Sequence, residues 1–330
     1  MHAMLAQAIV VSFVSSLAVL LGLLWRFGHR ALDMPNERSL HERPVPRIGG
    51  IAIFAGAAVP LALGALEFWL PLFLGLALAL LSFLDDLRGL PAAGRLAAHF
   101  AAVGVLVWHA LSPMNAGALL LFVLAGVWIT NLYNFMDGAD GIAGGMACIG
   151  FGAYALAARF AGAEGMMVAC VAIAAASAAF LLLNFHPARV FMGDVGSIPL
   201  GFLVFALGLV GWRDDLWPLW FPLLVFAPFI GDATLTLLKR AMRREGLWLA
   251  HREHYYQRLV RMDFGHRGTA LLAYATMLVC AGAALFGREQ SPPVQSAVAA
   301  ATTLALAALA RWVDLRWRRR APEPESPGSA

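Results

Sequence analysis

The chain has 330 residues, of which 61% are hydrophobic and only 13% are charged, with a mean hydropathy of +0.73 and a formal net charge of +4. Soluble globular proteins carry a charge at about a quarter of their positions, so this composition excludes a water-soluble globule, a disordered chain and a nucleic-acid-binding domain. Three cysteines without CxxC spacing exclude a disulfide-stapled secreted module.

The apolar residues fall into long uncharged blocks, each close to the roughly 20 residues that a helix needs to cross a bilayer. We therefore expect an all-α, polytopic integral membrane helical bundle with about eleven transmembrane helices. The first block is expected to be a span and not a cleavable signal peptide, because it is too long and basic residues follow it. The expected spans are 4–26, 48–66, 68–84, 95–112, 115–133, 141–158, 165–183, 196–212, 216–238, 268–287 and 292–310.

The basic residues test this count, because cytoplasmic loops of membrane proteins are enriched in Lys and Arg. With the N-terminus outside, Arg159, Arg213 and Arg288 are the only three of the 24 Lys and Arg residues that fall in predicted outer segments. One miscounted helix would reverse the bias for every later loop. The pattern therefore predicts an outer N-terminus and a cytoplasmic C-terminus.

Polar residues gather in five clusters at the predicted cytoplasmic ends of the spans, at residues 33–50, 84–90, 131–141, 184–197 and 251–258. Ionisable groups at a bilayer boundary are costly unless they are paired or functional. We therefore expect a polar site that faces the cytoplasm.

The first two clusters are ambiguous when each is taken alone. The loop over 33–50 has the composition of an ordinary positively charged inner loop. Asp85 and Asp86 end a predicted helix, where a negative charge opposes the helix dipole unless a cation lies nearby. A solvated helix end is the alternative for this pair.

The third cluster is more informative, because Asn131, Asn134, Asp137 and Asp140 recur every three positions at the mouth of a span. Neighbouring members of such a series share a helix face, and the glycines among them let the backbone approach a ligand. Oxygen ligands of this kind suit Mg²⁺ or Mn²⁺ and not zinc. The alternative is an Asp-Gly turn between two helices.

The last two clusters add another carboxylate and a set of basic groups. Asp194 precedes a predicted helix, which it could simply cap. If the stretch 251–258 is helical, His251, His254 and Arg258 share a face that could clasp a diphosphate. The alternative is a basic surface helix that touches anionic lipid.

Carboxylates that hold a divalent metal beside Arg and His that hold phosphate are the groups that phosphoryl transfer needs. Two other functions would use similar charged residues. A transporter or flippase of anionic glycoconjugates would place polar residues near the membrane midplane and show repeated halves. A metal-dependent membrane phosphodiesterase would use water as the acceptor.

Five motifs occur in order between about residues 30 and 260. They are Asp33-Met-Pro-Asn-Glu-Arg-Ser-Leu-His41 leading to Pro46-Arg-Ile-Gly-Gly50, Asp85-Asp86, Asn131-x-x-Asn134-Phe-Met-Asp137-Gly-x-Asp140-Gly, Phe191-Met-Gly-Asp194-x-Gly-Ser197 and His251-Arg-x-His254-x-Tyr-Gln-Arg258. This combination resembles the polyprenyl-phosphate N-acetylhexosamine-1-phosphate transferase family, of glycosyltransferase family 4 type. The first and last motifs are more similar to its glycan-initiating branch than to translocase I of peptidoglycan synthesis. Gly89 stands where the latter has a lysine, so no role of that lysine carries over.

The resemblance implies that residues 1–320 form a single transmembrane catalytic domain. The Pro-, Glu- and Ser-rich composition of 321–330 predicts a disordered tail. By this resemblance, the protein would transfer an N-acetylated amino sugar 1-phosphate from a UDP-sugar to undecaprenyl phosphate and release UMP. This would be the first step of O-antigen or related envelope glycan synthesis. The implied cofactor is Mg²⁺, with Mn²⁺ as a substitute. The implied location is the bacterial cytoplasmic membrane with the active site on its cytoplasmic face. Its expected partners are the lipid, the nucleotide sugar and the bilayer, with no nucleic acid, and a homodimer is left open.

The resemblance also implies roles for individual residues. Asp85 and Asp86 would orient or deprotonate the lipid phosphate, and Asp137 and Asp194 would bind Mg²⁺ and the donor diphosphate. Direct attack by the lipid phosphate on the donor is favoured, with a covalent aspartyl intermediate as the competing mechanism. The substrate-binding set comprises Asn131, Asn134, Asp140, His251, Arg252, His254, Arg47 and His41.

Overall fold

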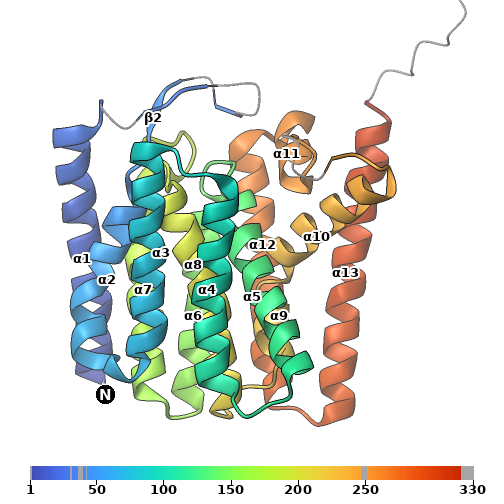
Figure 1. Cartoon of the computed structure of the whole chain (residues 1–330). Helices are drawn as coiled ribbons and strands as arrows, with labels where there is room; N and C mark the ends of the chain where they lie inside the picture. The colour runs from blue at the N-terminus through green and yellow to red at the C-terminus, as the bar shows by residue number, and fades with distance from the viewer. Residues whose placement is uncertain (1, 30–31, 36–39, 42, 247–250, 321–330) are drawn as a thin grey trace, which may run out of the picture.

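The computed structural model describes residues 2–29, 32–35, 40–41, 43–246 and 251–320. They form a bundle of antiparallel helices with one very short two-stranded sheet (Figure 1). The helices are α1 (His2–Phe27), α2 (Gly49–Gly64), α3 (Trp69–Arg88), α4 (Ala92–Leu111), α5 (Ala116–Phe135), α6 (Ile142–Phe160), α7 (Glu164–Asn184), α8 (Asp194–Arg213), α9 (Trp220–Val225), α10 (Ala227–Met242), α11 (Tyr255–Leu259), α12 (Gly265–Arg288) and α13 (Pro292–Arg318). The strands are β1 (Leu32–Asp33) and β2 (Val45–Pro46), paired antiparallel.

Within these described residues, nine helical segments are long and apolar enough to cross a membrane, and α2 is a shorter apolar helix of 16 residues. An all-α polytopic membrane protein, as the sequence predicts, is therefore confirmed as the class. The number of spans, the orientation of the termini and the single catalytic domain stay predictions. The expected disordered tail at 321–330 lies outside the described residues.

The prediction of one continuous span over residues 216–238 was wrong. The chain there forms α9 and α10, which are separated at Phe226. Pro222 and Pro228 lack the amide proton that a continuous helix would use, and Pro228 lies instead in the first turn of α10. Hydropathy alone does not register this break.

Most loops that carry the polar motifs lie at one end of the bundle, which we call the polar end. In Figure 1 this end carries β2 and α11, whereas the N-terminus lies at the opposite end. The alternating direction of the helices brings the end of α3, the end of α5 and the start of α8 there. Segments that are far apart in the sequence therefore meet at one level of the bundle.

Helix α8 is the central helix, with 94% of its most apolar window buried. Apolar residues on all of its faces make this burial favourable, since a helix without a polar face belongs in a core. Asp194 is its first residue, where the helix dipole stabilises a negative charge. The core helix thus presents a carboxylate at the polar end.

Small residues join α2 to the start of α8. A Cβ atom on Gly50 would lie 2.3 Å from the backbone nitrogen of Gly196, and one on Gly196 would lie 2.8 Å from the Cα of Gly50. The amides of Gly49 and Gly50 donate to the carbonyls of Phe191 and Met192 at 2.9 Å. This close contact fixes the first polar motif against the segment that leads into Asp194.

Replacing Gly50 by alanine should therefore destabilise the protein by about 1–3 kcal/mol, because the new methyl group meets backbone that cannot rotate away. Thermal unfolding in detergent would measure the change. Gly104→Ala is the matched control, since a Cβ there meets nothing within 4 Å. Equal unfolding temperatures for the two variants would contradict the packing argument.

Candidate active site

A polar cavity of about 230 Å³ opens at the polar end. Its walls come from the loop before α2, the turn between α5 and α6, the segment before α8 and the residues that begin α11 and α12. The lining residues are Asp33, Leu40, His41, Arg47, Asn134, Asp137, Gly138, Ala139, Asp140, Asn184, Phe191, Gly193, Asp194, Gln257 and His266. Six predicted site residues therefore share one cavity.

Arg95, in the first turn of α4, connects the second acidic motif to this cavity. Its Nη1 lies 2.8 Å from Oδ2 of Asp85 and 3.9 Å from Oδ2 of Asp194. Asp85 also accepts a 2.6 Å hydrogen bond from the amide of Leu90, just beyond the end of α3. These two contacts offset the unfavourable position of Asp85 at a helix C-terminus. Asp86, its neighbour, is exposed.

Asp137 is the uncompensated carboxylate of the cavity. Burial, followed by the negative charges of Asp194 and Asp33, raises the pKa of its carboxyl well above the usual value. Among the described residues, no side chain or backbone group forms a hydrogen bond or ion pair with this carboxyl. A cation placed beside it would remove the repulsion and favour its ionised form.

Asp194 and the two asparagines occupy distinct positions. Gly193 is the N-cap of α8, so Asp194 does not cap this helix, and that alternative is excluded. Asn134 accepts a 2.7 Å hydrogen bond from the hydroxyl of Ser197, which ties α5 to α8 at the cavity. Asn131 lies one turn deeper and donates to the carbonyl of Val127 within its own helix, away from the lining.

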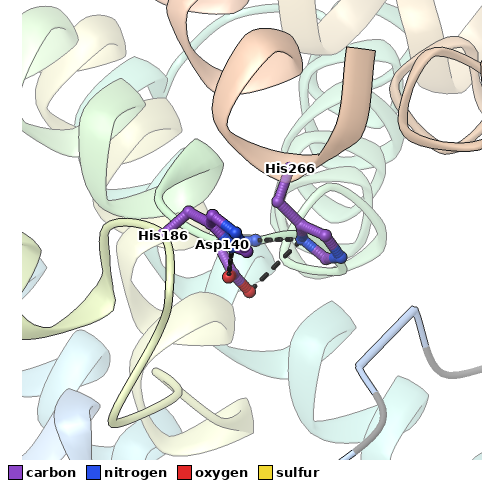
Figure 2. A group of neighbouring side chains, drawn as sticks. All are labelled: Asp140, His186 and His266. Carbon is purple, nitrogen blue, oxygen red and sulfur yellow. Dashed lines mark hydrogen bonds and ion pairs between the residues drawn. The ribbon is translucent and has the colours of Figure 1, made fainter. Parts of the chain in front are cut away.

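Asp140 is buried, with 5% of its surface exposed, and protein groups already contact both oxygens of its carboxylate (Figure 2). Its Oδ2 lies 2.7 Å from Nδ1 of His186 and accepts a 3.1 Å hydrogen bond from the amide of Ala188. Its Oδ1 lies 3.3 Å from Nδ1 of His266. Burial alone would raise the pKa of the Asp140 carboxyl, but the bonds to His266 and His186 outweigh it and lower that pKa.

The fifth motif is arranged differently from the clasp that the sequence predicts. Helix α11 begins only at Tyr255, with His254 as its N-cap, so His251 lies outside the helix. Arg258 is buried and forms ion pairs with Asp314 at 3.1 Å and Glu253 at 3.5 Å. The expected shared face of His251, His254 and Arg258 is therefore wrong, because the helix starts too late and Arg258 is already neutralised.

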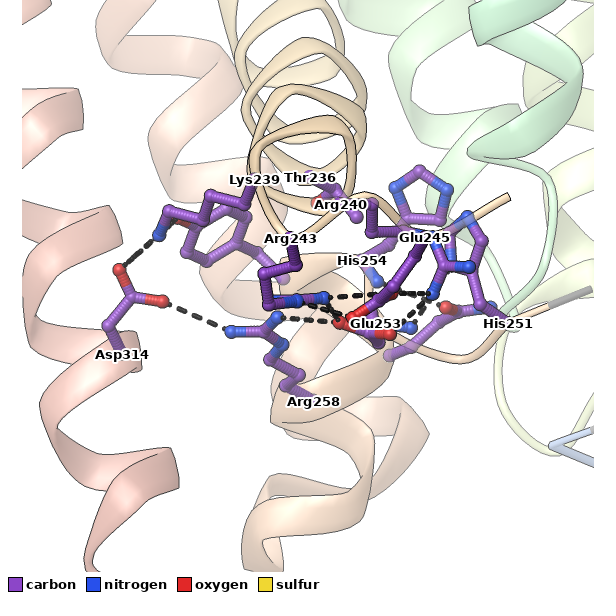
Figure 3. A network of polar contacts seen from close by, with 12 residues as sticks. Thr236, Lys239, Arg240, Arg243, Glu245, His251, Glu253, His254, Arg258 and Asp314 are labelled. Carbon is purple, nitrogen blue, oxygen red and sulfur yellow. Dashed lines mark hydrogen bonds and ion pairs between the residues drawn. The ribbon is translucent and has the colours of Figure 1, made fainter. Parts of the chain in front are cut away.

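A network of charges holds this motif to α10 and α13 (Figure 3). Burial, followed by the charges of His254 and Arg240, lowers the pKa of His251 to about 4, so this ring is neutral near pH 7. Neither His251 nor His254 is part of the described cavity wall, and Arg252 is not either. Gln257 is the residue of this motif that lines it. The labelled members of the network are Thr236, Lys239, Arg240, Arg243, Glu245, His251, Glu253, His254, Arg258 and Asp314.

Three residues outside the five motifs support the site. Asp232 accepts hydrogen bonds of 2.9 Å from the amides of Tyr255 and Tyr256, and thus caps α11 from a distance. Arg95 and His266 reach the acidic groups only through the fold. The sequence offers one signal for Arg95. It lies in the first turn of α4, shortly after Asp85 and Asp86 at the end of α3.

The fold and the cavity define a polytopic membrane protein whose acidic and basic side chains meet at one end of a helical bundle. Residues 68–212, which run from α3 through α8, match the model of Glycosyl transferase family 4. The chain belongs to this family, as the comparisons with individual relatives also indicate.

Three relatives illustrate the similarity. A decaprenyl-phosphate N-acetylglucosaminephosphotransferase of Mycobacterium tuberculosis is 30% identical over 77% of this chain and 75% of the relative. A probable undecaprenyl-phosphate N-acetylglucosaminyl 1-phosphate transferase of Bacillus subtilis is 27% identical over 82% and 79%. An undecaprenyl-phosphate alpha-N-acetylglucosaminyl 1-phosphate transferase of Escherichia coli is 27% identical over 73% and 72%.

The buried Asp140 carboxyl makes a pH-dependent contribution to stability. Because its pKa is lowered in the folded state, the contribution is full above the ordinary Asp pKa and is lost as the pH falls through the lower, folded value. Asp140→Asn should therefore cost on the order of 2 kcal/mol at pH 7, and this cost should decrease steadily as the pH falls below the ordinary Asp pKa of about 3.9. Unfolding temperatures of both proteins across this range would measure it. A deficit that does not vary with pH would contradict this account.

Proposed function

We propose that this protein transfers an N-acetylated amino sugar 1-phosphate from a UDP-sugar to undecaprenyl phosphate at the cytoplasmic face of the inner membrane. The products would be UMP and undecaprenyl-diphosphate-sugar, the first lipid-linked intermediate of O-antigen or a related envelope glycan. The names of the relatives make N-acetylglucosamine the first sugar to test.

The observation that carries this proposal is the convergence of three separate acidic motifs. Asp137 and Asp194 line the same polar cavity, and Arg95 joins Asp194 to Asp85. Phosphoryl transfer depends mainly on positioning and on neutralising charge, for which such a cluster of acids and one shared arginine is suited.

The donor set fits Mg²⁺, because the carboxylates of Asp137 and Asp194 and the amide oxygen of Asn134 are hard oxygen ligands. The raised pKa of Asp137, which lacks a cationic partner in the described chain, supports the same assignment. Asp137 and Asp194 would hold the ion, with Asn134 beside them. A bound Mg²⁺ would neutralise the donor diphosphate and so reduce the repulsion between two anionic substrates.

The chain's own residues would then bring the two substrates together. Arg47, which lines the cavity, and Arg95, which contacts Asp194 of its wall, would attract the lipid phosphate, and Asp85 would keep Arg95 in place. A phosphate oxygen would attack the phosphorus that bears the sugar. As the new P–O bond forms, the bond from that phosphorus to the bridging oxygen breaks, and UMP leaves with the bonding electrons.

A second cavity offers room for the prenyl chain. It has a volume of about 460 Å³, lies between α10, α12 and α13, and is lined mainly by apolar residues. Its walls include Met136 at the end of α5 and Tyr256 of α11, both next to residues of the polar cavity. A lipid could therefore place its phosphate at the polar end while its chain stays in an apolar environment.

His41 supports a bound ligand in the polar cavity. Its Nε2 is buried and lies 3.9 Å from Oδ2 of Asp33, but it forms no hydrogen bond among the described residues, and its ring meets Phe191 edge-on at 4.9 Å. Buried polar groups are nearly always hydrogen-bonded, so this nitrogen is available to a group that arrives with a substrate.

Purified protein incubated with UDP-N-acetylglucosamine, Mg²⁺ and undecaprenyl phosphate tests the proposal by measuring UMP. Release that requires the lipid supports the transferase. Release without the lipid would indicate a phosphodiesterase, and no release with any UDP-amino sugar would favour transport.

Asp137→Asn and Asp194→Asn should each lower turnover by at least about 100-fold, because they remove ligand charge at constant side-chain size. Asp214→Asn is the control, since this carboxylate pairs with Arg213 at the far end of α8. Size-exclusion profiles should match for all three. Near-normal turnover of either cavity variant at saturating Mg²⁺ would remove that residue from the metal site.

Arg95→Gln should lower turnover by about tenfold or more, because the negative charges of Asp85 and Asp194 would then repel the lipid phosphate. Arg95→Lys should retain part of the activity, since a lysine keeps the charge but not the planar fork. Arg88→Gln, an exposed position at the end of α3, is the control. Equal rates for Arg95→Gln and Arg88→Gln would remove Arg95 from the site.

A further inference from the structure

The wall of the polar cavity that carries His41 is attached to the bundle on two sides. On one side, Phe191 donates a 2.8 Å hydrogen bond to the carbonyl of Pro46 and forms a backbone bridge with Arg47. On the other side, Nε2 of His266 lies 3.2 Å from the carbonyl of Leu40, next to His41 in the chain. We propose that His266 is a positioning residue that holds the His41 wall of the cavity against Asp140.

The imidazole of His266 bridges two segments that are remote in sequence. Its Nε2 faces Leu40, and its Nδ1 lies 3.3 Å from both Oδ1 and the backbone nitrogen of Asp140. An imidazole has nitrogens on two different edges of a rigid ring, which suits it to this geometry. The ring also stacks on His186 at 5.4 Å with an interplanar angle of 9°.

The Asp140 carboxylate that His266 contacts is itself held in place. The second oxygen of Asp140 is held by His186 and by the amide of Ala188, so the carboxylate cannot rotate freely. One residue further, the carbonyl of Gly141 accepts a 2.8 Å hydrogen bond from the hydroxyl of Tyr274, which lies on the same helix as His266. Helix α12 thus contacts the turn around Asp140 at two points. Through its contact with the carbonyl of Leu40, His266 holds the neighbouring loop against this turn.

Direct contact with substrate is the alternative role, because His266 lines the cavity. Both of its nitrogens are already engaged with protein groups. The buried Nε2 of His41, in contrast, forms no hydrogen bond among the described residues, and its contact with Oδ2 of Asp33 is long, at 3.9 Å. The geometry therefore assigns ligand contact to His41 and alignment of His41 to His266.

Two conservative substitutions separate the two arms of the bridge. Asn places its amide near the position of Nδ1 and keeps the Asp140 contact, whereas Gln reaches the position of Nε2 and keeps the Leu40 contact. Neither can span both. His109→Gln is the matched control, because His109 is exposed and lies in the last turn of α4, away from the polar end.

Hydrogen exchange measured by mass spectrometry on the full-length protein in detergent tests the proposal without any activity. The peptide covering residues 40–50 should exchange about fivefold faster in His266→Asn than in the control, as expected for loss of one hydrogen bond. His266→Gln should show a smaller increase. Unchanged exchange in His266→Asn would overturn the proposal. If that variant does not fold, His266→Gln decides, and exchange equal to the control overturns it.

A kinetic measurement extends this test and rests on the proposed function. With UDP-N-acetylglucosamine as donor, His266→Asn should raise the donor KM about tenfold and leave kcat within about twofold, because misalignment weakens binding and not the chemical step. A loss confined to kcat would overturn the positioning role. If the unaltered protein transfers no sugar phosphate, the proposed function fails, while the exchange measurement still decides the role of His266.

Discussion

Negative charge gathered at one end of a membrane protein is the constraint on which the polar end of this molecule depends. Carboxylates from four segments meet there, and each must be neutralised or kept neutral. Arg95 serves Asp85 and Asp194, and two histidines serve Asp140. Asp137 has no such partner among the described residues, and its raised pKa reflects how unfavourable its ionised form is at this position. The protein thus neutralises Asp85 and Asp140 with its own cationic groups, and it leaves Asp137 without such a group among the described residues.

Much of this arrangement could be predicted from the sequence, because hydropathy and spacing are local properties. Ten of the eleven apolar blocks correspond to continuous helices among the described residues, and the alternating direction of these helices brings the acidic motifs to one end. The exception over residues 216–238 has a local cause as well, because Pro228 lies just after the break between α9 and α10. Asp137 and Asp194 were expected to lie together, and they do share a cavity.

The rest depends on contacts that no local pattern encodes. Arg258 lies in a motif that looks suited to phosphate, yet Asp314, 56 positions later in the chain, neutralises it. His266 contacts groups that lie 126 and 226 positions away. A sequence indicates which groups are charged or polar, but their partners are determined only when the helices pack. For this reason the motif residues were predicted better than the residues that orient them.

The fifth motif shows what this difference means for function. Helix α11 has only five residues, yet its consecutive residues Tyr256 and Gln257 line the apolar cavity and the polar cavity, respectively. The hydroxyl of Tyr256 donates to the carbonyl of Phe135, at the end of α5, between Asn134 of the polar cavity and Met136 of the apolar cavity. A helix this short is not stable by itself, so it needs anchors from outside. Asp232 supplies one by capping it, and Asp314 supplies another through Arg258.

These anchors explain why so many charges of the motif point away from the polar cavity. They hold a thin partition between a space suited to a lipid chain and a space suited to charged groups. In the proposed reaction between a lipid phosphate and a nucleotide sugar, this partition would let the phosphate reach the polar cavity while the prenyl chain stays on the apolar side.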